Sequence, residues 1–159
     1  MIAHAALALS LSLVLGEGAA PDELTAATVG SLKLQVPAAW QRRAEEGSTR
    51  YAVPSGEAYF DVTVGKVQRK GGMPAAVCLK KILAGVGKGF KKTKLGGQPA
   101  AFKEYVDADE QGKKFVELTY LGCDGTTTWS LSFHMLQEKR DRFAPLAERI
   151  SRSLEYTRE

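Results

Sequence analysis

Residues 128–135 read Thr-Trp-Ser-Leu-Ser-Phe-His-Met, and this stretch decides the fold class. Large apolar side chains alternate with small or polar ones, and successive side chains of a β-strand point to opposite faces. The residues also favour strands in their own right. The stretch therefore predicts a strand that buries one face in a core and turns the other face, with His134, towards solvent.

Further strands are predicted on both sides of this one in the sequence. The same alternation marks residues 31–36, 58–65 and 115–120, and residues 98–106 are predicted as another strand. Clusters of Gly, Pro, Asp and Ser separate the runs by short gaps, which favours hairpins and an antiparallel sheet. Residues 98–106 are expected to pair with residues 113–121 across the polar turn at 107–112.

Two segments show the helical period instead. In residues 74–86, apolar side chains recur at positions 79, 82, 83 and 86, and Pro74 suits the first turn of a helix. In residues 141–154 an apolar stripe begins at Phe143, with Asp141 as the expected N-cap. Strands and helices together predict an α+β fold, a central antiparallel β-sheet flanked by helices.

The N-terminal segment differs from the rest of the chain. Residues 2–15 contain no Lys, Arg, Asp or Glu, and small residues follow as far as Ala20, which is the order of a secretory signal peptide. We expect residues 1–20 to be a signal peptide and residues 21–159 to be a single domain; the alternative is a buried N-terminal helix. No Cys lies near residue 20, so we expect a periplasmic or secreted protein rather than a lipoprotein.

Composition limits the possible partners. The 159 residues are 44% hydrophobic and 25% charged, as in an ordinary globular domain, and no apolar run reaches the roughly 18 residues of a membrane span. We therefore expect no transmembrane segment in the mature chain. Removing residues 1–20 takes away Glu17 alone, so the formal charge moves from +4 to +5. A charge this small does not indicate nucleic acid as a partner.

The two cysteines, Cys78 and Cys123, stand 45 residues apart with no C-x-x-C motif. In an exported protein such a pair indicates one structural disulfide. Two unpaired buried thiols are the alternative. A thiol nucleophile is disfavoured because His134 is the one histidine in residues 21–159 that could act as its base.

Catalytic and cofactor motifs are absent from the sequence. It has no G-x-S-x-G, no S-x-x-K and no histidine cluster for a metal. Residues 85–89, Gly-Val-Gly-Lys-Gly, follow a predicted helix rather than a strand, so they indicate a helix end and not a phosphate loop. Residues 107–112 resemble the start of a calcium loop, but its twelfth position is Leu118, which favours a plain turn. We expect no cofactor and no enzymatic activity.

Lysines form the densest charged stretch of the chain. The six residues are Lys80, Lys81, Lys88, Lys91, Lys92 and Lys94. Such a patch can bind an anionic glycan, a lipid headgroup or an acidic protein face. The alternative is a solvated helix face and loop without a ligand.

The order of several short motifs resembles PsbP-like domains. Ser31–Trp40 (SLKLQVPAAW) resembles their strand, Val-Pro and Trp opening, Leu95–Ala100 (LGGQPA) precedes a strand, and Phe143–Ser153 resembles their terminal helix. This superfamily includes extrinsic photosystem II proteins, Ran-binding Mog proteins and bacterial DcrB-type envelope proteins. The resemblance spans about residues 25–155. It implies an α/β/α sandwich and a binding or scaffolding role, because the family has no common catalytic residues.

Three functions are consistent with these features. The one we favour is an exported, non-enzymatic protein of the cell envelope that binds or stabilises another protein. The second is a module that binds a polyanion or a lipid headgroup through Lys80 to Lys94. The third is a small hydrolase with a carboxylate site that the sequence does not reveal.

Overall fold

The computed structural model describes residues 23–157, so the expected signal peptide at residues 1–20 lies outside the described residues. The elements are, in order, β1 (Leu24–Val29), β2 (Leu32–Pro37), β3 (Gln41–Glu45), β4 (Ser48–Ala52), β5 (Ala58–Lys66), α1 (Ala75–Val86), β6 (Lys91–Leu95), β7 (Gln98–Ala108), β8 (Lys114–Cys123), β9 (Thr127–Leu136), the 3-10 turn η1 (Gln137–Lys139), α2 (Arg140–Arg152) and β10 (Glu155–Tyr156). Neither α1 nor α2 is long and apolar enough to cross a membrane.

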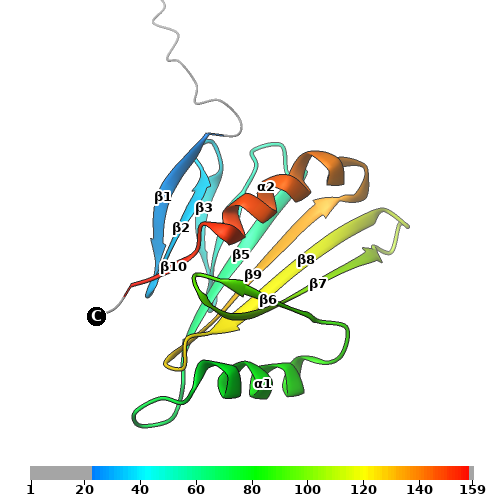
Figure 1. Ribbon diagram of the computed structural model, residues 1–159. Helices are drawn as coiled ribbons and strands as arrows, with labels where there is room; N and C mark the ends of the chain where they lie inside the picture. Colours follow the sequence, from blue (N-terminus) through cyan, green and yellow to red (C-terminus); the bar gives the residue numbers. More distant parts are fainter. Residues whose placement is uncertain (1–22, 158–159) are drawn as a thin grey trace, which may run out of the picture.

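Two antiparallel sheets form the framework (Figure 1). The large sheet has seven strands in the order β3-β4-β5-β9-β8-β7-β6, and the small sheet has three in the order β1-β2-β10. Burial alternates along all of β9, which is the middle strand of the large sheet. The strand expected at residues 31–36 belongs to the small sheet, because the chain turns at Gly30 and pairs β1 with β2.

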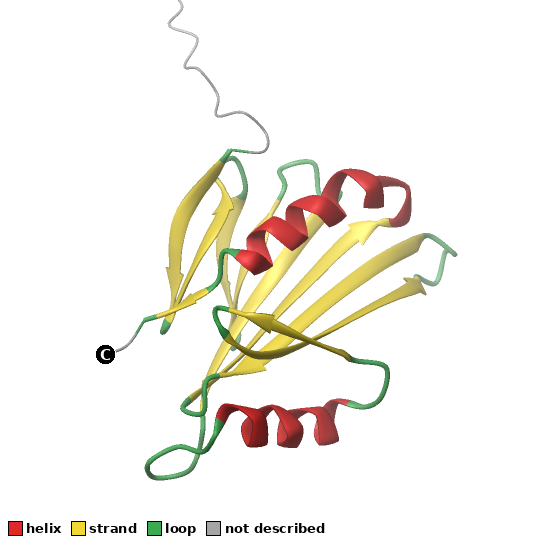
Figure 2. Cartoon of the chain, in the orientation of Figure 1, coloured by secondary structure: helices red, strands yellow, loops and turns green. Residues whose placement is uncertain are grey.

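Helices lie on both faces of the large sheet (Figure 2). α2 and the small sheet cover one face, where β9 contributes Trp129, Leu131, Phe133 and Met135 to the main core. α1 packs on the opposite face, against β7 and β8. The predicted α+β fold, a central antiparallel sheet flanked by helices, is confirmed.

The main core is built from fully buried side chains of both layers. Phe60 and Leu131 of the large sheet and Ile150 of α2 are all completely inaccessible to solvent. Trp40, in the connection between β2 and β3, contacts the rings of Phe60 and Phe143 at centroid distances of 5.8 and 5.9 Å. Trp40 therefore ties the connection between the two sheets to the N-terminal half of α2.

The start of α2 differs from the sequence prediction. The helix begins at Arg140 with Lys139 at the N-cap position, and no side chain caps it. The 3-10 turn η1 runs directly into the helix, so a separate capping residue is not needed to start it. Asp141 lies in the first turn instead, where a negative charge is still favourable.

α1 is attached by a small apolar cluster and one covalent bond. Leu79 packs on Ala101 and Leu121. Cys78 and Cys123 form a disulfide with their Cα atoms 6.1 Å apart, as their even number predicted. Because this cluster has three buried members, with Ile82, Leu83 and Phe90 only partly buried beside them, we expect the disulfide to supply much of the attachment of the helix.

Replacing both cysteines by alanine should therefore lower stability. We expect a loss of about 4 kcal/mol in the free energy of unfolding, because the unfolded chain regains the freedom of a closed loop of this size. Urea denaturation of the oxidised protein and of the Cys78→Ala/Cys123→Ala variant measures the difference. Equal midpoints and slopes for the two proteins would contradict the prediction.

Two glycines should respond in opposite ways to alanine. A Cβ at Gly122 would lie 2.5 Å from Cζ2 of Trp129, whereas a Cβ at Gly85 in α1 would meet nothing within 4 Å. Gly122→Ala should cost about 1–3 kcal/mol because the buried ring must shift. Gly85→Ala should stabilise by up to about 1 kcal/mol because it favours the helix. Thermal denaturation of the two variants tests whether Gly122→Ala lowers the stability and Gly85→Ala raises it. A Gly122→Ala protein that is more stable than the unchanged protein would contradict the prediction, because it would show that the Trp129 ring can move aside at no cost.

Candidate functional site

One face of the large sheet is left largely open. α1 packs mainly on β7 and β8, so most of the side chains of β4, β5 and β9 on this face lie beyond the helix in the described residues. Strand register places Tyr59, His134, Glu117 and Tyr105 in one row across β5, β9, β8 and β7. Asp61, Ser132, Thr119 and Lys103 form the adjacent row. We call these two rows, together with Arg50 of β4, the open face.

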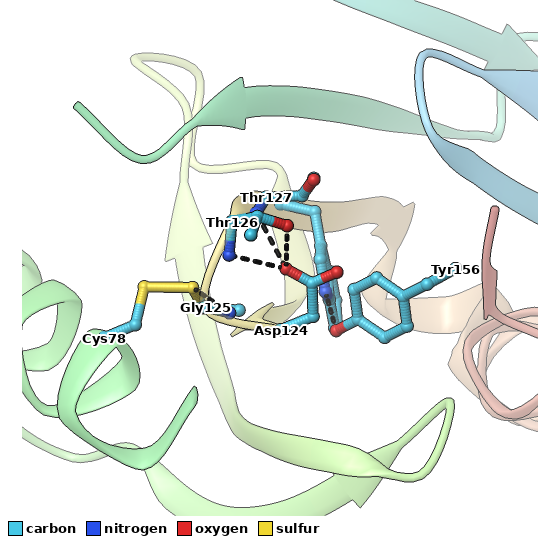
Figure 3. Close-up of a disulfide and its surroundings, with 8 residues drawn as sticks. Cys78, Asp124, Gly125, Thr126, Thr127 and Tyr156 are labelled. Atoms are coloured by element: carbon cyan, nitrogen blue, oxygen red, sulfur yellow. Dashed lines mark hydrogen bonds between the residues drawn. A yellow bond between two sulfur atoms is a disulfide. The ribbon is translucent and has the colours of Figure 1, made fainter. Parts of the chain in front are cut away.

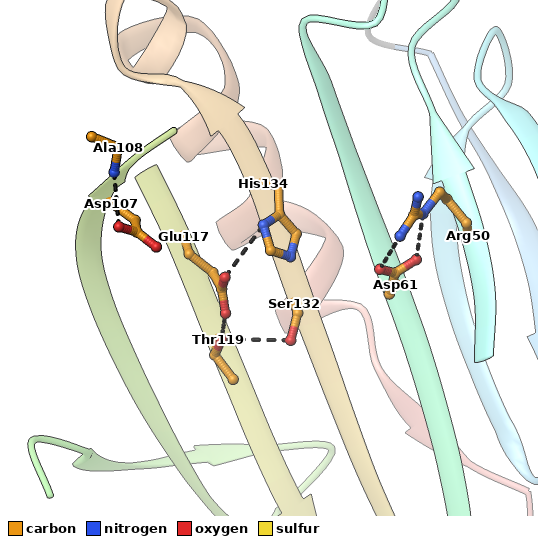
Figure 4. A network of polar contacts seen from close by, with 8 residues as sticks. All are labelled: Arg50, Asp61, Asp107, Ala108, Glu117, Thr119, Ser132 and His134. Atoms are coloured by element: carbon orange, nitrogen blue, oxygen red, sulfur yellow. Dashed lines mark hydrogen bonds and ion pairs between the residues drawn. The ribbon is translucent and has the colours of Figure 1, made fainter. Parts of the chain in front are cut away.

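An arginine and a tyrosine are fixed at one end of the open face (Figure 4). The Arg50 guanidinium donates two hydrogen bonds of 2.8 Å to the Asp61 carboxylate. These hydrogen bonds raise the pKa of Arg50 above its ordinary value. The same guanidinium lies 4.1 Å from the centre of the Tyr59 ring, within the range of a cation–π contact. Arg50 is thus held flat on the sheet while its outer side remains accessible.

His134 continues this arrangement towards β8. Its ring stacks on Tyr59 with centroids 4.6 Å apart, and Nδ1 lies 3.3 Å from Oε2 of Glu117. The Thr119 hydroxyl donates to the other oxygen of Glu117 at 2.9 Å. His134 lies on the polar side of β9 as predicted, but its side chain is only 25% exposed because Tyr59 and Glu117 hold it.

The hydroxyl groups of the open face are not hydrogen-bonded to His134 in the described residues. The Ser132 hydroxyl has Thr119 as its side-chain partner at 3.5 Å, and no bond between it and His134 occurs in the described residues. Burial and the neighbouring Glu117 raise the pKa of Tyr105 to about 12. A hollow of about 320 Å³ lies beside this row, with Phe115 and Asp107 among the residues that line it.

The sequence identified His134 but not its neighbours in this site. Tyr59, Glu117 and Tyr105 come from three strands, and only the register between strands brings them together. The alternation of apolar and polar residues in the sequence did place Tyr59 and Glu117 on the polar side of their strands, but it could not show that these strands are neighbours of β9.

The predicted lysines lie on two elements and the loop between them, and all six are exposed. Lys80 and Lys81 belong to α1, Lys88 follows it, and Lys91, Lys92 and Lys94 belong to β6, which is an edge strand. Lys92 lies opposite Ala101 on the α1 side of the sheet, whereas Lys91 lies opposite Phe102 on the α2 side. The patch therefore wraps around an edge of the sheet instead of lying on one face.

The glycine-rich segment at 85–89 ends α1, as predicted. Gly87 is the C-cap of the helix with a φ of +92°. The polar segment at 107–112 forms the β7–β8 turn, where Oδ1 of Asp109 accepts hydrogen bonds from the backbone N–H groups of Gln111 and Lys113. Within residues 23–157, no group of three or more His, Cys, Asp or Glu side chains is placed to hold a metal ion.

A cleft of about 560 Å³ lies between α2 and the β6–β7 hairpin. At the edge of this cleft, Arg140 at the start of α2 donates two hydrogen bonds, of 2.8 and 3.1 Å, to the carboxylate of Glu104 in β7. This contact holds the pKa of Glu104 below its ordinary value. The apolar part of the cleft comes from Phe102 and Tyr120, whose rings stack at 5.0 Å. The Arg140–Glu104 pair thus connects the helix to the hairpin.

The turn between β8 and β9 is organised by Asp124, next to the disulfide (Figure 3). Its Oδ1 accepts hydrogen bonds from the backbone N–H groups of Thr126 and Thr127 and from the Thr126 hydroxyl. Burial alone would raise the pKa of Asp124, but these hydrogen bonds outweigh it and the pKa lies below its ordinary value. The carbonyl groups of Gly125 and Thr126 in this turn accept hydrogen bonds from Met73 and Val67, so the turn also holds the loop before α1.

Comparison with solved structures shows a known fold. The chain is similar to a protein of Bacteroides thetaiotaomicron, with a TM-score of 0.64 and 19% identity over 81% of this chain, although it spans only 46% of that protein. It is also similar to Mycobacterium tuberculosis LpqN, described as involved in cell envelope biogenesis, with a TM-score of 0.58 and 16% identity over 86% of this chain and 91% of that one. Cyanobacterial PsbP from Synechocystis aligns with a TM-score of 0.59 and 10% identity over 87% of this chain and 95% of that one.

No protein-family model matches the sequence, and no curated protein matches it. The structural likenesses show that the chain has the PsbP-like fold, which confirms the resemblance in the sequence.

The role of Asp124 predicts a pH dependence of stability. Because the folded state lowers the pKa of Asp124 below its ordinary value of 3.8, the stabilisation from Asp124 is present above pH 3.8 and is lost as the pH falls through the folded pKa. Asp124→Asn should lower the free energy of unfolding at neutral pH by about 1.5–3 kcal/mol and flatten its fall in acid. Urea denaturation between neutral and acidic pH measures both effects.

The matched control is Glu110→Gln, which removes an acidic charge from an exposed turn. It should change the free energy of unfolding at neutral pH by no more than about 0.5 kcal/mol. An Asp124→Asn protein as stable as this control would rule out the role given to Asp124.

Proposed function

We propose that the chain is a non-enzymatic, exported protein of the cell envelope that binds another protein through its open face. The observation that supports this most directly is the row of Arg50, Tyr59 and His134. These side chains are held in fixed positions on the part of the sheet face that α1 leaves uncovered. Arginine and tyrosine are enriched among the side chains that contribute most to binding at protein interfaces.

Preorganisation favours the same conclusion. Asp61 fixes Arg50 from one side, and Glu117 fixes His134 from the other. Side chains that are already ordered lose little conformational entropy when a partner covers them. A face that only needed to be soluble would not require the stack of Tyr59 on His134 or the cation–π contact of Arg50.

The hydrolase alternative receives less support. In residues 23–157, His134 is paired with a carboxylate, but neither Ser132 nor Thr119 donates a hydrogen bond to its ring. A general base needs such reach to a nucleophile or to a substrate proton. The names of two of the similar structures, one tied to cell envelope biogenesis and one to PsbP, are compatible with a role in binding.

Shortening the side chains of Tyr59 and His134 should weaken the binding of the partner without unfolding the protein. In-cell crosslinking of the tagged protein identifies its partner, and the purified partner is then titrated against Tyr59→Ala/His134→Ala. We expect Kd to rise at least about tenfold, since central interface anchors each contribute more than about 1 kcal/mol.

The control variant is Arg142→Ala/Arg149→Ala, which shortens two exposed side chains of α2, away from the open face. It should bind like the unchanged protein. Two outcomes would contradict binding through the open face. One is that the two double variants weaken binding equally, and the other is that the partner binds Tyr59→Ala/His134→Ala with unchanged affinity.

A further inference from the structure

Charge is distributed very unevenly along this chain. Residues 62–103 contain ten Lys and Arg residues and no Asp or Glu, whereas the rest of the chain carries twelve bases and all 18 acids. The ten are Lys66, Arg69, Lys70, Lys80, Lys81, Lys88, Lys91, Lys92, Lys94 and Lys103. They lie at the end of β5, in the loop before α1, on α1, in the loop after it, on β6 and on β7. We call this set the basic end.

The elements that carry the basic end are joined to one another. α1 packs on β7 and β8, β6 pairs with β7, and Val67 and Met73 of the loop before α1 bond to the β8–β9 turn. α1 and this loop form the lower end of the molecule in Figure 1. The ten positive charges therefore lie on α1 and on the elements joined to it.

These cations are not neutralised within the described chain. Nine of the ten are exposed and Lys103 is half-buried. None lies within 4.0 Å of a carboxylate in residues 23–157, although the charge of Lys91 contributes to the lowered pKa of Glu104. Like charges gathered in this way repel one another and oppose the compact state. An external anionic surface would relieve the repulsion.

The need to protect an edge strand explains only some of the lysines in the basic end. Lysines on an edge strand prevent pairing with the strands of other molecules, and this explains Lys91, Lys92 and Lys94 on β6. It does not explain Lys80 and Lys81, which lie on a helix, or Lys70 in the loop before that helix.

The outer side of α1 adds apolar surface to the charge. At 100° per residue, Val77, Lys81 and Ala84 fall on the side opposite the buried Leu79, and all three are exposed. Val77 is 44% exposed, and Val86 at the end of the helix is 47% exposed. Lysines beside exposed aliphatic side chains on one helix are typical of segments that lie at a membrane surface.

We propose that the basic end docks on the surface of an anionic phospholipid bilayer. Charge complementarity carries the assignment, because each Lys or Arg near such a surface contributes about 1 kcal/mol and no acidic residue between positions 62 and 103 opposes it. The charges wrap around one end of the fold, which suits an extended surface better than a single small ligand. This site goes beyond the proposed function. It shares only Lys103 with the open face, and its test changes no residue of the open face, so either proposal can fail alone.

The test is sedimentation of the purified, oxidised protein with lipid vesicles. Vesicles of phosphatidylcholine alone are compared with vesicles that also contain about 30% phosphatidylglycerol, at about 50 mM and about 500 mM NaCl. Binding should require the anionic lipid and should weaken at least about tenfold at the higher salt concentration, where charges are screened over a few ångströms.

Two triple variants with the same change in net charge locate the surface. Lys81→Glu/Lys88→Glu/Lys92→Glu should lose at least about tenfold in partition coefficient. Lys33→Glu/Arg42→Glu/Lys114→Glu changes three exposed cations outside residues 62–103 and should stay within about threefold of the unchanged protein.

Three results would overturn the proposal. They are equal losses in the two triple variants, equal binding to neutral and anionic vesicles, and binding of soluble dextran sulfate without any sedimentation on vesicles. Circular dichroism and a thiol assay of the disulfide are to be recorded for both variants, so that a loss of binding in a folded variant is attributable to the changed charges.

Discussion

The pleat of β9 is the constraint on which the rest of this structure depends. Because the strand lies between β5 and β8, the four apolar side chains of Trp129, Leu131, Phe133 and Met135 must enter one layer, and the polar side chains between them must enter the other. A slip of one residue would exchange the two sets and destroy the core. The register that buries Phe133 on Phe60 is therefore the same register that places His134 beside Tyr59 and Glu117.

Strands that alternate in burial were the easiest to predict from the sequence, whereas β3 and β6 were not predicted. β5, β8 and β9 alternate in burial, so their apolar residues recur at every second position. Every residue of β3 is exposed, and β6 has four exposed residues before the buried Leu95, so neither strand shows the alternation that marks a strand. The lysines of β6 instead stand out as a charged run, which conceals their role at the edge of the sheet.

The candidate sites divide in the same way. The lysines of α1 and β6 are close in sequence, so composition alone revealed them. Tyr59, Glu117 and His134 are separated by long stretches of chain, and only the pairing of three strands makes them neighbours. Lys103 belongs to both surfaces, since its Nζ lies 5.7 Å from the Phe90 ring and 5.4 Å from the Tyr105 ring. The two surfaces therefore adjoin, and a partner on the open face would lie beside whatever covers the basic end.

The three-stranded sheet joins segments from opposite parts of the chain. β2 pairs with both β1 and β10, and Thr157 donates backbone and side-chain hydrogen bonds to the carbonyl of Ser31, 126 residues earlier. A contact of such long range cannot form until nearly all of the polypeptide has been synthesised. During synthesis, the β2 edge that receives β10 is thus among the last surfaces to be closed, and a chain interrupted before residue 155 exposes that edge to strands of other molecules.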